Sequence, residues 1–102
     1  MTKKEWNEVY LKLHNFYYEF SLAYVDYQNG KTNKIKEESV KKCNLMIEKT
    51  LSILTSDKEL EFFLFGENAN DMKKNYILED FRKLQYFDKD MIGIIENILK
   101  LT

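Results

Sequence analysis

The sequence contains no proline, three glycines, one cysteine and one histidine in 102 residues. Without proline, and without a sustained alternation of apolar and polar residues, it favours helices over a sheet. A lone cysteine excludes an internal disulfide. Zinc and iron–sulfur sites need clustered thiolates and imidazoles, which one cysteine and one histidine do not supply. We therefore expect no metal and no cofactor.

Recognisable catalytic constellations are also lacking. Gly30, Gly66 and Gly93 are isolated, and none precedes the Lys-Ser/Thr pair of a phosphate-binding loop. No glutamate stands three residues before His14, which excludes the Glu-x-x-His pairs of a ferritin-type site. We interpret His14 as a residue at the edge of the core and Cys43 as a small core residue, rather than as a base and a nucleophile. We predict that the protein is not an enzyme.

Positive and negative charges are nearly balanced, and the formal net charge is −1. This balance argues against a general nucleic-acid binder, whose affinity comes mostly from neutralising phosphates. No apolar run approaches the roughly 18 residues that cross a bilayer, and no apolar segment follows the N-terminal lysines as in a secretion signal. We expect a cytoplasmic protein that binds no membrane. Arg82 is the only arginine among 16 basic residues, a bias typical of a low-G+C bacterium or its mobile elements.

The sequence is rich in large aromatic side chains, with seven Phe, seven Tyr and one Trp in a chain that is 44% hydrophobic. A chain of this length predicts a single domain, spanning residues 1–102. Such a domain buries about two-thirds of the surface that its unfolded chain exposes, which is enough for a core without disulfides.

The segment from Glu5 to Tyr27 organises the rest of the chain. Thr2 and Glu5 have the spacing of a capping box. The helix should end near Gln28, where Asn29-Gly30 offers a left-handed glycine. At about 100° per residue, large side chains form a broad main stripe on one face. This main stripe consists of Trp6, Val9, Tyr10, Leu13, Phe16, Tyr17, Phe20, Tyr24 and Tyr27.

A thinner second stripe lies on nearly the opposite side of the same helix and consists of Leu11, Tyr18, Leu22 and Val25. A helix at the rim of a small bundle needs only one apolar face. The second stripe therefore indicates either burial beneath another segment or contact with a partner.

A second helix is predicted to begin after Thr32 or Asn33 and to end near Thr55. Its apolar face centres on Ile47 and includes Val40, Cys43, Met46, Thr50, Leu51, Ile53 and Leu54. Residues 31–56 hold six lysines against three glutamates, and four of these lysines lie early in the helix. Lysine near a helix N-terminus opposes the helix dipole, so helix propensity does not explain these positions.

Three shorter helices are predicted to follow. Ser56 and Glu59 have capping-box spacing and open a short helix that ends before Gly66, and residues 67–70 read as a loop. A fourth helix runs from Asn70 or Asp71 to about Tyr86, with Ile77, Leu78, Phe81 and Leu84 inward. Asp88 caps a fifth helix whose stripe is Met91, Ile92, Ile95, Ile98 and Leu99. A single kinked helix is the alternative to a break at residues 86–88.

Together these elements predict an all-α fold. The architecture is a compact four- to five-helix bundle with two long N-terminal antiparallel helices and shorter C-terminal helices.

Our leading functional hypothesis is a small protein-binding module that occludes another protein. The role that we expect is that of an inhibitor, immunity or anti-defence protein of a low-G+C bacterium or its phage. The hypothesis rests on one small domain, no catalytic constellation and more bulky apolar surface than a lone bundle needs. The predicted contacts are Leu11, Tyr18, Leu22, Val25, Phe62 and Phe65.

Two alternatives remain open. A dimeric nucleic-acid-binding regulator would use Lys34, Lys36, Lys41 and Lys42 at the start of the second helix. A structural homodimer would form through the second stripe. The sequence identifies neither the partner nor the oligomeric state.

Overall fold

The computed structural model describes residues 1–65 and 82–102, without the side chains of residues 63–65 and 82. The described elements are α1 (Lys3–Asn29), α2 (Asn33–Leu54), α3 (Lys58–Phe65) and α5 (Arg82–Leu99). These ranges contain helices and no strand, which confirms the all-α class for this part of the chain. The predicted loop at residues 67–70 and most of the predicted fourth helix, with Ile77, Leu78 and Phe81, lie outside the described residues.

The N-terminus of α1 forms the predicted capping box. The Glu5 amide donates to Thr2 Oγ1 at 3.2 Å, and the Thr2 amide donates to Glu5 Oε1 at 3.3 Å. The prediction of a left-handed glycine after the helix is wrong, because Gly30 has φ −60° and ψ 128°. A Cβ at Gly30 would instead lie 3.0 Å from the Asp26 carbonyl oxygen. A residue with a Cβ would therefore make a tight contact at the point where the chain turns back.

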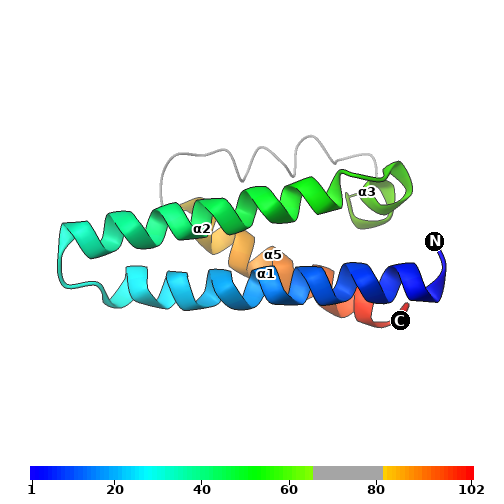
Figure 1. Cartoon of the computed structure of the whole chain (residues 1–102), viewed down its shortest axis with the longest axis horizontal. Helices are drawn as coiled ribbons and strands as arrows, with labels where there is room; N and C mark the ends of the chain where they lie inside the picture. Colours follow the sequence, from blue (N-terminus) through cyan, green and yellow to red (C-terminus); the bar gives the residue numbers. More distant parts are fainter. Residues whose placement is uncertain (66–81) are drawn as a thin grey trace.

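After this turn, α2 runs antiparallel beside α1, and the two long helices pack along their length (Figure 1). Thr32 caps α2 by accepting from the Ile35 amide at 3.2 Å. The predicted inner face of α2 is confirmed, since Cys43, Met46, Ile47, Thr50 and Leu54 are buried. The other members, Val40, Leu51 and Ile53, are partly buried against this core.

The start of α3 differs from the prediction. Asp57, and not Ser56, caps the helix, because Asp57 Oδ1 accepts from the amides of Glu59 and Leu60 at 2.8 and 3.2 Å. The Ser56 hydroxyl instead donates to the Ile53 carbonyl at the end of α2. The Met1 amino group lies 2.9 Å from Glu59 Oε1, and this ion pair joins the N-terminus to α3.

Helix α5 packs against α1 and runs without interruption through residues 86–88. The predicted break there is therefore wrong. Asp88 does not cap a helix; it accepts a 2.8 Å hydrogen bond from the Tyr17 hydroxyl of α1.

The inner face of α5 also departs from the prediction. The residues that it buries are Leu84, Phe87, Met91, Ile94 and Ile98. Their spacing of three and four residues continues one straight stripe from the first turn of the helix. Ile92 and Leu99, predicted inward, are 47% and 49% exposed because each follows a buried residue and is rotated about 100° from it.

Helices α1, α2 and α5 meet at Phe20 of α1, which is completely buried. Its ring packs edge-on against Phe87 of α5 at 4.6 Å between centroids, and its carbonyl lies 4.0 Å from Cys43 Sγ of α2. Trp6 and Leu13 are buried with it, and so is Ala23, which the prediction omitted. The remaining main-stripe residues, Val9, Tyr10, Phe16, Tyr17, Tyr24 and Tyr27, are partly buried against this core.

Candidate protein-binding surface

The second stripe of α1 lies on open surface. Leu11, Tyr18, Leu22 and Val25 expose 53%, 60%, 53% and 50% of their area. All four belong to one uninterrupted helix that is held from its opposite face by α2 and α5. Their backbone positions are therefore set by the core, so little ordering is needed before a partner can bind.

A groove between α1 and α2 extends the second stripe toward α2. It has a volume of about 390 Å³, and Leu22 and Ala23 of α1 face Leu45 and Met46 of α2 across it. Leu45 is 47% exposed, and sequence reasoning did not select it. In the sequence, Leu45 is only an isolated leucine away from the apolar face of α2. It becomes part of an apolar surface because α1 lies beside α2.

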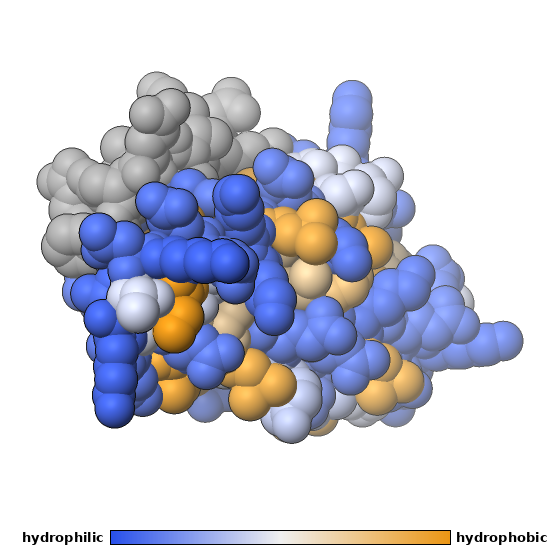
Figure 2. Space-filling view, turned by 60° about the vertical axis from the view of Figure 1, so that its left-hand side comes forward, coloured by the Kyte–Doolittle hydropathy of each residue, from blue (hydrophilic) through white to orange (hydrophobic). Residues whose placement is uncertain are grey.

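Charged side chains line the same groove. Glu19 and Asp26 come from α1, and Lys42 comes from α2. An apolar floor bordered by charges of both signs is the usual arrangement of a protein interface, in which apolar contacts are surrounded by a polar rim. Figure 2, which views one face of the molecule, likewise shows apolar side chains in small patches among polar ones.

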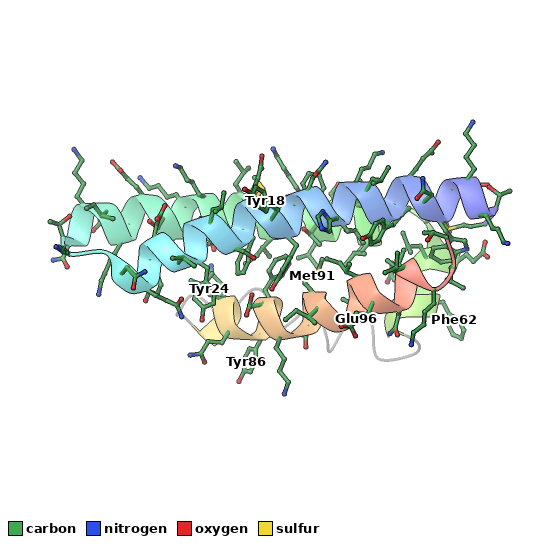
Figure 3. All side chains as sticks on the ribbon, turned by 90° about the horizontal axis from the view of Figure 1, so that it is seen from below. Tyr18, Tyr24, Phe62, Tyr86, Met91 and Glu96 are labelled. Carbon is green, nitrogen blue, oxygen red and sulfur yellow. The ribbon has the colours of Figure 1, made fainter. Side chains whose placement is uncertain are left out.

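The predicted contacts on α3 do not join this surface. Phe62 is 66% exposed. In Figure 3, however, it lies near the end of the molecule that holds the termini, and Tyr18 points away from α5 on another side. The side chain of Phe65 lies outside the described residues. The structure therefore brings together the four α1 residues and leaves Phe62 apart from them.

The four lysines of the nucleic-acid alternative are exposed at the start of α2. Lys36 and Lys41 line a second shallow groove together with Tyr27, Glu37 and Val40. Lys42 instead lines the α1–α2 groove. Carboxylates thus accompany the lysines in both grooves, which weakens the attraction of this region for phosphates.

His14 and Cys43 occupy opposite environments. Cys43 is completely buried, and this burial raises the pKa of its thiol to about 11. A reactive thiolate is therefore disfavoured at neutral pH. His14 is exposed on α1, with its ring 5.8 Å from that of Tyr10. Cys43 is therefore the core residue that was predicted, whereas His14 is exposed and does not lie at the edge of the core as predicted.

Two further features bear on the classes of function. Among residues 1–65 and 82–102, no group of three or more His, Cys, Asp or Glu side chains is placed to hold a metal ion. Within the same ranges, no helix combines the length and the apolar character needed to cross a membrane.

The candidate surface is thus one apolar stripe on α1 with a groove beside it. Comparisons of the chain with protein-family models, with curated proteins and with solved structures found no match.

Proposed function

We propose that this protein is a small non-enzymatic binding module that acts by occluding another protein. Its scaffold is a four- to five-helix bundle, and its biological role is that of an inhibitor, immunity or anti-defence protein of a low-G+C bacterium or its phage. The observation that carries the proposal is the second stripe, in which four large apolar side chains remain half or more exposed on a helix whose other face is already packed.

The physical argument is that exposed apolar side chains gain free energy when a partner removes them from water. Burying a large apolar side chain completely contributes about 1.5–3 kcal/mol. These four side chains are only partly buried in the free protein, so a partner that covers their exposed area would gain a part of that free energy. Tyr18 at the middle of the stripe suits the role of anchor, since its ring is rigid and its hydroxyl remains compatible with water. Glu19, Asp26 and Lys42 beside the groove would orient the partner.

The test is capture of proteins from a host lysate by the wild-type chain and by the Tyr18→Asp/Leu22→Asp variant. We expect the variant to lose a partner that the wild type retains, because two carboxylates would be buried without compensation. The matched control is Ile92→Asp/Leu99→Asp, which changes two apolar residues of similar exposure on α5. Circular dichroism establishes that all three proteins are folded. Retention of every partner by the Tyr18/Leu22 variant would contradict the proposal.

The same experiment at two salt concentrations separates this function from nucleic-acid binding. Phosphate contacts made by Lys34, Lys36, Lys41 and Lys42 would weaken steeply as salt rises. Apolar contacts through the second stripe should change little. Loss of the captured species at moderate salt, with nucleic acid in the eluate, would favour the alternative.

A further inference from the structure

We draw no further inference here: the strongest candidate, the groove between α1 and α2 in which Leu22 and Ala23 face Leu45 and Met46, belongs to the surface already proposed for protein binding, and nothing in the structure shows what covers it.

Discussion

The main stripe and the second stripe of α1 are built from similar residues and have different fates. Phe20 of the main stripe is completely buried, whereas Tyr18, two positions away, is 60% exposed. Leu13 and Leu22 show the same contrast at 0% and 53%. Side-chain size and hydropathy therefore do not decide which face of a helix becomes the core. The decision depends on which face the other helices cover.

The main stripe forms the core because side chains of α2 and α5 cover it. Phe20 meets Phe87 of α5 and Cys43 of α2, and the Tyr17 hydroxyl donates to Asp88. Beside the second stripe lies the edge of α2, at the groove between Leu22 and Leu45. We therefore assign folding stability to the first face and not to the second, for which we propose binding, and the following experiments test the assignment of stability.

The largest expected difference is between Phe20→Ala and Tyr18→Ala. Removing the Phe20 ring leaves a cavity among three helices, and we expect the free energy of unfolding to fall by about 3–5 kcal/mol. Removing the exposed Tyr18 ring should change it by less than about 0.5 kcal/mol. Urea denaturation followed by circular dichroism measures both values. Similar losses for the two variants would show that the second stripe also belongs to the core.

The second-largest expected effect is a loss of folding stability at alkaline pH, caused by the buried thiol of Cys43. The pKa of Cys43 is raised to about 11 in the folded protein, mainly by burial, whereas a thiol in an unfolded chain titrates near ~8.5. The folded state then holds a proton that the unfolded state releases, so stability is complete below about pH 8.5 and falls as the pH rises toward 11. The slope approaches about 1.4 kcal/mol per pH unit for one proton.

The measurement is the free energy of unfolding from pH 7 to pH 10, with Cys43→Ala as the control. We expect the control to be less stable at pH 7 but to lose less stability between pH 9 and pH 10. Burial and other interactions also raise the pKa values of Tyr17 and Tyr24, which adds a loss of the same sign above about pH 10. A wild-type profile identical in shape to that of Cys43→Ala would contradict the assigned role of the thiol.

Tyr17→Phe tests a hydrogen bond of the main stripe that joins α1 to α5. The change removes the 2.8 Å hydrogen bond to Asp88 and keeps the ring, so the free energy of unfolding should fall by about 1 kcal/mol. Tyr18→Phe is the matched control on the exposed face and should have almost no effect on stability. Thermal and urea denaturation provide the comparison, and equal effects would contradict the structural role of the Tyr17 hydroxyl.

The smallest effect concerns two glycines in different surroundings. A Cβ at Gly93 in α5 meets no atom within 4 Å, so Gly93→Ala should stabilise the protein by about 0.5–1 kcal/mol through the higher helix propensity of alanine. At Gly30 a Cβ would lie within 3.0–3.2 Å of Asp26, Ile35 and Lys36, so Gly30→Ala should destabilise it. Melting temperatures give the two signs, and stabilisation at Gly30 would show that the turn has room to adjust.

Local chemistry in the sequence determined a large part of this structure. The capping box of Thr2 and Glu5, the cap at Thr32 and the buried face of α2 all follow from spacing along one segment. The two-sided apolar character of α1 follows in the same way, because a helix fixes the direction of every side chain relative to its neighbours. These features need no knowledge of where the other helices lie.

Features that depend on contacts between segments could not be predicted from the sequence. Asp88 resembles a helix cap in sequence, yet Tyr17 of α1 binds it within an unbroken α5. Leu45 becomes part of the candidate surface because α2 lies beside Leu22, and Phe62 lies apart from Tyr18 because α3 packs elsewhere. The physical reason is that periodicity sets directions around one helix axis, whereas burial depends on which other helix occupies each direction.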